Sequence, residues 1–466
     1  MPTSNWSRSR HPFSCGSRTF FSRRIHPMRR SVLFLCAALL FPLLAGCQAE
    51  LGYSVAVGAE AVKADLALAG TDWPWWRGPD RNGIAPASAN PPVTLDEKSL
   101  LWKAPIAGRG HSAAMIVGSR VFLTTADEAA QTQSVICLAR KDGELLWIKQ
   151  LHEGGFDHNN KKNSFASSSV ASDGRRIFVS FWNHGSVWTT ALDLDGTQLW
   201  ELEVSRFTSH QGYGASPAIY GDNVIVATDN KGTGKGCLVA LNRVTGEIAW
   251  SQDRPVMPNY VSPIILKVDG KDQLLMSGCE QVTSYDPNTG KELWSTSATT
   301  TECVGTAVVA GGLVFASGGY PKHETVGVRA DGSGEVVWRN GVRIYTPSLL
   351  AYQDHLYAVA DDGIAYCWEA ATGMEKWKGR LGGGFSASPI LAAGNLYLAN
   401  EKGQVFVVQP DPGKLVEVAV SQVGDQIIAT PSFSGRQVFI RSASEENQRQ
   451  EFLYCFENKK STPSKK

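Results

Sequence analysis

Residues 240–250 read ALNRVTGEIAW, and residues 284–294 repeat the pattern as SYDPNTGKELW. Each segment ends in Trp and carries a Gly four residues earlier, where a positive φ angle allows the tight turn of a β-hairpin. The alternating residues after this Gly predict a strand that pairs back on the strand before it. Six segments of this kind end at Trp147, Trp200, Trp250, Trp294, Trp338 and Trp377.

A second pair of strands is expected upstream of each Trp segment. SPAIYGDNVIVAT from Ser216 and SPILAAGNLYLAN from Ser388 combine a small polar residue, a Pro, a short strand, a turn and an alternating strand, and similar runs start at Thr346 and Thr430. Four strands in about 45 residues is the size of a propeller blade. We therefore predict an all-β, eight-bladed β-propeller of four-stranded antiparallel blades over residues 100–457, with blades that start near His111, Phe165, Tyr213, Tyr260, Cys303, Tyr345, Phe385 and Ile428.

The two ends of the repeat region are expected to close the ring together. The last repeat ends at Glu457 after three strands, whereas Leu100-Leu101-Trp102-Lys103 resembles a fourth strand with no repeat before it. We predict that this N-terminal strand completes the eighth blade, because closure removes an open edge that would otherwise aggregate. Trp residues at equivalent ring positions are expected to pack blade against blade rather than stack on a cofactor: Trp102, Trp147, Trp200, Trp250, Trp294, Trp338 and Trp377.

The N-terminal residues have the features of an export signal. Arg29 and Arg30 precede an uncharged apolar run at 31–45, which is too short to span a bilayer comfortably and fits a signal-peptide core. Residues 1–27 are interpreted as an over-long extension and 28–47 as the leader. The end of the leader, Leu44-Ala45-Gly46-Cys47, resembles a lipoprotein lipobox, which implies lipid on Cys47; cleavage beyond Cys47 and an uncleaved anchor are the alternatives. Residue 48 is Gln rather than Asp, and the resemblance to Gram-negative lipoproteins then implies sorting to the outer membrane, facing the periplasm.

Charge and cysteine content restrict the possible functions of the chain after residue 47, which we call the body. The chain has 45 basic and 44 acidic residues, and removal of residues 1–47 leaves 38 basic and 44 acidic residues. This slightly acidic body does not favour nucleic-acid binding. The remaining cysteines include no adjacent pair and no CxxC, so we expect small buried core residues rather than a zinc ribbon or thioredoxin-type site: Cys137, Cys237, Cys279, Cys303, Cys367 and Cys455.

The repeat resembles the tryptophan-docking repeat of the PQQ-binding-like (quinoprotein-type) propellers over about residues 100–457. With the lipobox and eight blades, it is most similar to the BamB-like outer-membrane assembly lipoproteins. This resemblance implies a non-catalytic, lipid-anchored, monomeric scaffold that binds envelope proteins. Residues 48–72 are expected to be a linker and 458–466 a polar tail. In the segment 73–99, WPWWRGPDRNG resembles the opening motif of exported propellers and is expected to cap the ring, with an exposed docking patch as the alternative and an Arg77–Asp80 pair to fix the loop.

The enzyme alternative is a quinoprotein dehydrogenase. The resemblance implies that such an enzyme holds PQQ between a Trp and a disulfide of adjacent cysteines, with Ca²⁺ as the Lewis acid. The absence of a Cys-Cys pair from the sequence argues against this activity, so we expect no catalytic residues and no cofactor, and PQQ with calcium remains the alternative. His152, Glu153, Asp157 and His158 match no standard metal-ligand spacing, and we interpret them as part of a polar loop.

The residues just before the innermost strands are the candidate binding residues, because these segments edge the mouth of a propeller channel. Aromatic and polar side chains together suit contact with a peptide, a glycan or an aromatic ligand, so extracellular sensing of a small ligand or glycan is a third possible function. Alternatively, the aromatic rings plug the channel and the charged groups are solvated. The predicted rim consists of Arg109, His111, Phe165, His210, Tyr213, Tyr260, Glu302, Arg343, Tyr345 and Phe385.

Overall fold

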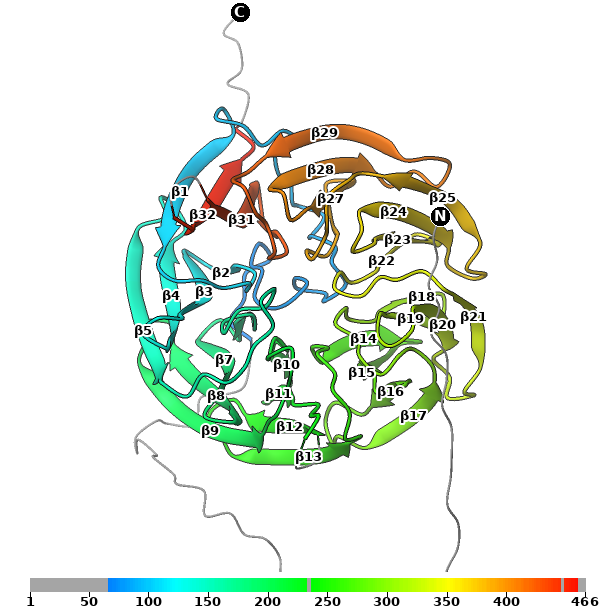
Figure 1. Ribbon diagram of the computed structural model, residues 1–466, viewed down its shortest axis with the longest axis horizontal. Coiled ribbons are helices and arrows are strands. Elements are labelled where there is room, and N and C mark those ends of the chain that lie inside the picture. Colours follow the sequence, from blue (N-terminus) through cyan, green and yellow to red (C-terminus); the bar gives the residue numbers. More distant parts are fainter. Residues whose placement is uncertain (1–65, 233–235, 446–447, 460–466) are drawn as a thin grey trace, which may run out of the picture. The chain divides into compact units, whose positions relative to one another are not determined.

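The computed structural model describes residues 66–232, 236–445 and 448–459. The predicted leader, Cys47 and most of the predicted linker lie outside these residues. The described chain forms eight four-stranded antiparallel sheets, which follow one another in a ring (Figure 1). The prediction of an all-β, eight-bladed propeller is therefore confirmed. Among the described residues, no helix is long and apolar enough to cross a membrane.

Strand order is the same in every blade, from a short innermost strand to an outer strand at the rim. Blade 1 consists of β2 (Met115–Val117), β3 (Arg120–Asp127), β4 (Thr132–Ala139) and β5 (Leu145–Glu153). Blade 2 consists of β6 (Ala171–Ser172), β7 (Arg176–Asn183), β8 (Ser186–Asp193) and β9 (Gln198–Arg206). Blade 3 consists of β10 (Ala218–Tyr220), β11 (Asn223–Ala227), β12 (Gly236–Asn242) and β13 (Ile248–Arg254).

The next three blades are built in the same way. Blade 4 consists of β14 (Ile264–Val268), β15 (Lys271–Gly278), β16 (Gln281–Tyr285) and β17 (Glu292–Ser297). Blade 5 consists of β18 (Val308–Ala310), β19 (Leu313–Gly318), β20 (Glu324–Arg329) and β21 (Val336–Asn340). Blade 6 consists of β22 (Leu350–Tyr352), β23 (His355–Val359), β24 (Ile364–Glu369) and β25 (Glu375–Arg380).

The last two blades complete the ring. Blade 7 consists of β26 (Ile390–Ala392), β27 (Asn395–Ala399), β28 (Gln404–Gln409) and β29 (Val416–Gln422). Blade 8 takes three strands from the C-terminal end and one from the N-terminal side: β30 (Ser432–Ser434), β31 (Gln437–Ser444), β32 (Gln450–Glu457) and β1 (Leu100–Ile106). The second and third strands of each blade are mostly buried, because neighbouring blades cover both of their faces.

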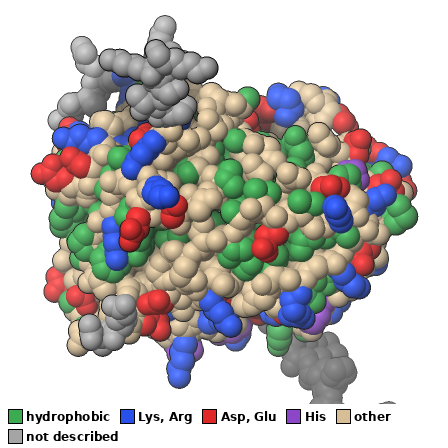
Figure 2. Space-filling model, turned by 90° about the horizontal axis from the view of Figure 1, so that it is seen from above, with side chains coloured by type: hydrophobic (Ala, Val, Ile, Leu, Met, Phe, Trp, Pro, Cys, Tyr) green, Lys and Arg blue, Asp and Glu red, His purple; other side chains and the backbone are tan. Residues whose placement is uncertain are grey.

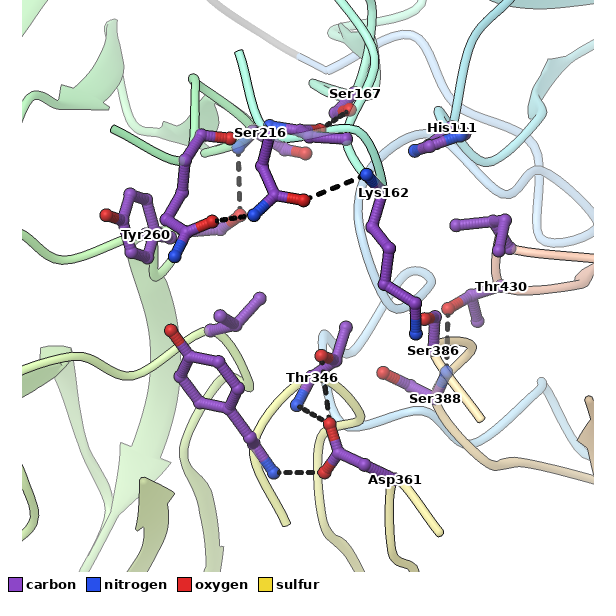
Figure 3. Close-up of a pocket in the computed structure, with 18 of the residues that line it drawn as sticks. His111, Lys162, Ser167, Ser216, Tyr260, Thr346, Asp361, Ser386, Ser388 and Thr430 are labelled. Atoms are coloured by element: carbon purple, nitrogen blue, oxygen red, sulfur yellow. Dashed lines mark hydrogen bonds between the residues drawn. The ribbon is translucent and has the colours of Figure 1, made fainter. Parts of the chain in front are cut away.

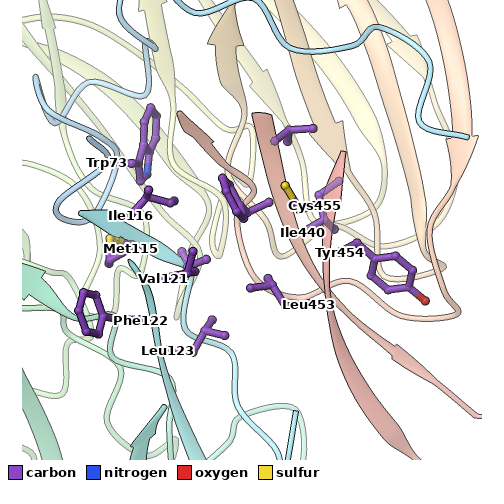
Figure 4. Packing of buried hydrophobic residues seen from close by; sticks show 14 of the residues in the cluster. Trp73, Met115, Ile116, Val121, Phe122, Leu123, Ile440, Leu453, Tyr454 and Cys455 are labelled. Atoms are coloured by element: carbon purple, nitrogen blue, oxygen red, sulfur yellow. The ribbon is translucent and has the colours of Figure 1, made fainter. Parts of the chain in front are cut away.

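The closing strand lies where the sequence predicts it. β1 pairs antiparallel with β32, and Trp102 is the partner of Cys455. The core of blade 8 then packs against that of blade 1 through one hydrophobic cluster, in which Leu453 and Ile440 belong to blade 8 and Ile116 and Val121 to blade 1 (Figure 4). The ring is thus closed by hydrogen bonds between the two ends of the repeat region.

Six of the seven docking Trp side chains lie against a glycine of the next blade. The seventh, Trp377, donates its indole N–H to the Asp411 carbonyl at 2.8 Å. A Cβ atom added to Gly246 would lie 2.8 Å from the Trp200 ring, and the Trp200 indole N–H donates to the Arg243 carbonyl at 3.2 Å. The glycine therefore provides the positive φ of its own hairpin and leaves room for the indole of the preceding blade. The same close contact joins Trp102 to Gly143, Trp147 to Gly196, Trp250 to Gly290 and Trp338 to Gly373. Trp294 makes a looser contact with Gly332, where an added Cβ would lie 3.4 Å from the Trp294 Cβ, and none with Gly334.

Gly246→Ala is expected to destabilise the ring more than a turn glycine without this contact. Both Gly246 and Gly221, in the first turn of the same blade, have positive φ angles of 77° and 53°. A side chain at either position carries a strain of about 1–2 kcal/mol, and overpacking against Trp200 adds about 1–3 kcal/mol at Gly246 alone. Urea denaturation of Gly246→Ala and Gly221→Ala measures the difference. Equal losses of unfolding free energy in the two variants would show that the close contact between the Trp200 indole and Gly246 does not contribute to stability.

Blade 7 departs from the repeat, because Glu417 stands where the other blades have Trp. Residues from the N-terminal segment pack there instead. Leu95 is buried and its amide N–H donates to Ser421 Oγ at 2.9 Å, and the Tyr397 hydroxyl donates to the Pro92 carbonyl at 3.1 Å. The segment before β1 therefore stabilises the part of the ring that lacks a docking indole.

All six cysteines within the described residues are free and buried, which confirms their interpretation as core residues. Cys137, Cys367 and Cys455 lie opposite the docking residues Trp147, Trp377 and Trp102 in the strand registers. Burial raises the pKa of the Cys137 thiol to about 12 and that of Cys367 to about 11. These thiols are therefore protonated and unreactive at neutral pH.

Candidate binding cavity in the central channel

A ring of hydroxyl side chains lines the channel, two residues before each innermost strand. Seven of the eight blades carry Ser or Thr there, and blade 1 carries Ala113. In six of the eight blade junctions, the side-chain oxygen of one blade accepts the backbone N–H of the equivalent residue in the preceding blade, at 2.8–3.0 Å. The ring of equivalent residues is Ala113, Ser169, Ser216, Ser262, Thr306, Ser348, Ser388 and Thr430.

The Trp-rich segment closes one end of the channel. It crosses the centre of the ring in blue in Figure 1, and it hydrogen-bonds to the innermost strands of several blades. Trp73 pairs with Ile116 of β2, and Ile84 pairs with Leu391 of β26. Trp73 and Trp75 are 1% and 5% exposed, whereas Trp76 is half-buried and lines the channel. The segment thus forms a floor rather than an exposed aromatic patch.

Two arginines hold this floor in place. Arg77 is buried and donates to the carbonyls of Asn82 and Leu349 at 2.8 and 2.7 Å, and burial lowers its pKa to about 9. Arg81 donates to the Ile219 carbonyl, and its guanidinium lies 4.2 Å from the Trp75 ring centroid. The expected Arg77–Asp80 pair is wrong, because Arg77 bonds backbone carbonyls and Asp80 is exposed.

The long connection between β5 and β6 leans over the opposite end, the mouth. Asn160 and Asn163 bond the side chain and carbonyl of Gln211 at 2.5 and 2.6 Å. Lys162 bonds Glu401 in blade 7 at 3.0 Å, and Figure 3 shows its side chain extended across the cavity towards Ser386. The mouth is therefore narrowed by a loop that belongs to none of the blades.

Between floor and mouth lies a cavity of about 570 Å³. Its wall carries hydroxyl groups from the ring and its neighbours, amides from Asn160, Asn163 and Gln211, and the phenol rings of Tyr260 and Tyr345 (Figure 3). The charged side chains that line it are Lys162, Arg343, Asp361 and Asp362. The cavity thus combines polar and apolar groups on its wall and is open at one end.

The structure brings four of the ten predicted rim residues to this cavity: His111, Tyr260, Arg343 and Tyr345. Tyr213 and Phe385 are buried, at 7% and 1% exposure, and pack against Phe207 and Phe406 between the blades. These residues lie among the interblade aromatic contacts, so the aromatic groups do not form one continuous ring around the mouth.

The other four predicted residues support the rim from outside the cavity. Phe165 stacks on Phe156 at 4.0 Å between ring centroids. Arg109 is bonded to Glu128 and to the Lys161 carbonyl, both at 3.0 Å. Glu302 is buried and accepts the Tyr345 hydroxyl at 3.0 Å, with His210 Nε2 3.4 Å from its second oxygen.

Electrostatics leave His111 neutral at the cavity wall. Burial lowers the pKa of His111 well below its usual value, and the positive charges of Arg109, Arg441 and Arg449 lower it further. Asp361 accepts the backbone N–H groups of Tyr345 and Thr346 at 2.8 and 3.2 Å. Its lone pairs are therefore already engaged in positioning the wall.

Sequence reasoning missed the hydroxyl ring, Trp76 as a lining residue, and the loop residue Lys162. The ring left a usable signal, because Ser or Thr recurs at one offset before seven of the eight innermost strands. In blade 6 the equivalent residue is Ser348 rather than Thr346, which the repeat pattern had suggested. Trp76 and Lys162 left no repeat signal, since both lie in segments outside the repeats.

The polar residues considered as metal ligands do not come together as a site. The His152 ring packs against Phe181 and Trp188, and burial, with a smaller effect of His184, lowers its pKa to about 4. In the part of the chain that the structure describes, no group of three or more His, Cys, Asp or Glu side chains could hold a metal ion.

The residues of the cavity do not fit PQQ with calcium. Among the residues that the structure describes, Asp361 and Asp362 are the carboxylates on the cavity wall, and Asp361 accepts backbone N–H groups. None of the cysteines is adjacent to another in the sequence, so the disulfide expected beneath PQQ cannot form. We derive no reaction step through this cofactor.

The fold and cavity define the class: an eight-bladed β-propeller with Trp-docked blades and a channel closed at one end. A family model described as outer membrane protein assembly factor BamB matches residues 131–379 and 322–416, which together cover more than half of the chain. The chain therefore belongs to this family of PQQ-like propellers.

Curated relatives agree with this assignment. A BamB from Burkholderia pseudomallei (strain K96243) is 24% identical over 360 residues, 73% of this chain and 84% of the relative. A BamB from Legionella pneumophila (strain Paris) is 25% identical over 116 residues, 25% of this chain, and the match spans only 29% of that relative.

Solved structures show the fold alone, since their identities to this chain are low. BamB from Moraxella catarrhalis aligns with a TM-score of 0.50 and 16% identity, over 79% of this chain and 97% of that one. A quinohemoprotein alcohol dehydrogenase from Comamonas testosteroni aligns with a TM-score of 0.59 and 11% identity, over 84% and 82% of the two chains. The fold is thus shared by a BamB structure and by a quinohemoprotein alcohol dehydrogenase.

Proposed function

We propose that this protein is a lipid-anchored, BamB-like scaffold of the cell envelope, which binds other envelope proteins without catalysis and without a cofactor. The leader and Leu44-Ala45-Gly46-Cys47 support an outer-membrane lipoprotein that faces the periplasm. The family match supports partners among outer-membrane assembly proteins. Because ring closure leaves no blade unfinished, a single chain is expected to be the working unit.

The observation that carries this proposal is the outer wall of blade 1. Its last strand, β5, is the outer strand of the sheet, so within the described residues one of its edges has no strand beside it. Leu145, Leu146 and Ile148 of this strand are 56%, 45% and 50% exposed. Trp147, between them, contacts Gly196 of the next blade. Figure 2 shows how apolar side chains gather in patches among charged ones on the wall of the ring.

An unpaired edge with exposed aliphatic side chains suits β-augmentation, in which an extended segment of a partner adds to the sheet. The neighbouring outer strand β9 differs, since its half-exposed residues include Glu201 and Glu203. The wall therefore offers a partner different chemistry at different blades, and blade 1 is the expected docking position.

A photo-crosslinking amino acid at Ile148 is expected to capture outer-membrane assembly proteins in intact cells. The matched position is Leu293, which is 49% exposed on the outer strand of blade 4. Mass spectrometry identifies the adducts from both positions. Assembly proteins at 148 and not at 293 support the proposal, and Ile148→Lys is expected to reduce their co-purification at least tenfold.

The reverse results would overturn it. The same adducts at both positions would mean that blade 1 has no special role. If the protein is correctly exported and forms adducts at neither position, the proposed scaffold function itself is contradicted.

A further inference from the structure

We propose that the channel cavity is a binding site for a neutral oligosaccharide. Its volume of about 570 Å³ lies within the usual range of about 300–1,000 Å³ for ligand sites. The floor closes one end, so a ligand enters and leaves through the mouth rather than threading the ring. This inference is independent of partner docking, because the cavity lies inside the ring and β5 at its rim.

The charge of the wall favours a neutral ligand. Lys162 and Arg343 contribute two positive charges, Asp361 and Asp362 two negative charges, and His111 is uncharged. Lys162 is also bonded to Glu401. A buried anionic ligand would need a positive charge in the cavity that no carboxylate already balances. The charges of the lining side chains sum to zero, so the cavity does not favour an anion.

The polar groups match sugar hydroxyls in particular. Five hydroxyl groups of the ring line the cavity, and each oxygen accepts a backbone N–H of the preceding blade. The hydroxyl proton is therefore left to donate to a ligand. These residues are Ser169, Ser216, Ser262, Ser388 and Thr430. The side-chain amides of Asn160 and Asn163 each use one N–H on Gln211, so each NH2 group keeps a second proton to donate, and Gln211, which carries an NH2 group of its own, also lines the cavity. Sugar hydroxyls are also donors and acceptors at once, so they can pair with such a wall at many points.

The aromatic groups of the cavity complete this match. The indole of Trp76 lines the cavity beside the closed end, and Tyr260 and Tyr345 line the wall. Aromatic faces provide large rigid apolar surfaces, against which the C–H face of a pyranose ring can pack. A site with such surfaces and many polar groups resembles neither a purely hydrophobic pocket nor an anion site.

Isothermal titration of the mature protein with maltotriose, cellotriose and chitotriose tests the proposal, with trigalacturonate and trialanine as anionic and peptide comparators. At least one neutral trisaccharide is expected to bind with a Kd of about 1 mM or tighter. Val304 lines the cavity, so Val304→Trp is expected to weaken binding at least tenfold. The control Val256→Trp changes a residue that is 52% exposed outside the cavity and is expected to bind as the parent does.

A second filling variant covers the case in which Val304→Trp does not fold. Gly214 lines the cavity, and an added Cβ would have only Ser167 within 4 Å, so Gly214→Leu is expected to fold and to lose binding. Binding of no neutral probe, preference for trigalacturonate or trialanine, or equal binding by parent and filled variants would each overturn the proposal.

Discussion

A chain that begins at Ala107 is expected to lose the closed ring and to aggregate. Without β1, the strand β32 loses its partner along six residue pairs, and the contact of Trp102 with Gly143 disappears. Loss of the buried Trp102 indole alone corresponds to about 3–5 kcal/mol, a large part of the roughly 5–15 kcal/mol that stabilises a domain. Exposed edges on β32 would then recruit other chains.

Size-exclusion chromatography and thermal melting compare this chain with one that begins at Leu66. The longer chain is expected to be a monomer with one cooperative transition. Addition of residues 66–106 as a separate peptide is expected to restore the monomer in part, and Trp102→Ala in the longer chain should lower its stability by about 3–5 kcal/mol. A monomeric chain from Ala107 that melts like the longer chain would contradict closure by β1.

Replacing Cys47 by Ser is expected to abolish the incorporation of labelled palmitate into the exported protein. The proposed lipid is attached to the Cys47 sulfur, and the Ser oxygen does not replace it in the Leu-Ala-Gly-Cys pattern. Stable attachment to a membrane by lipid alone requires more than one acyl chain. Incorporated palmitate is one of these chains, so the label measures the anchor itself.

Cys36→Ser provides the matched control, because Cys36 lies within the apolar run that precedes the proposed cleavage site. This variant is expected to keep the label at the parental level. Label that persists in Cys47→Ser, or a parent protein that never takes up palmitate, would remove the anchor from the proposed function and leave the propeller fold unchanged.

The repeated features of the propeller were predictable from sequence because every blade is built from the same short-range elements, hairpin turns and alternating strands. Gly246 and Trp250 recur at one spacing since a hairpin needs its turn and each outer strand needs a docking residue. Trp102 was recognisable as a displaced fourth strand for the same reason. However, the sequence did not reveal that Gly246 also receives the indole of Trp200, because this contact joins residues of different repeats.

The candidate site was less predictable, because part of its lining, such as Trp76 and Lys162, comes from segments outside the repeats. Of the predicted aromatic rim, Tyr260 and Tyr345 line the cavity, whereas Tyr213 and Phe385 pack between blades. All four stand near the start of an innermost strand, and the sequence pattern does not distinguish the two orientations. A small difference in backbone direction decides which side chain faces the channel.

The sequence by itself determined the number of blades, their strand order and the closing strand, since turn glycines and alternating apolar residues act over a few positions. Only the tertiary structure decided that Trp73, Arg77 and Ile84 close one end of the channel and that Lys162 reaches over the other. Those contacts join residues far apart in the chain, and their geometry depends on the finished ring. A local pattern specifies a blade, whereas a cavity exists only after eight blades have come together.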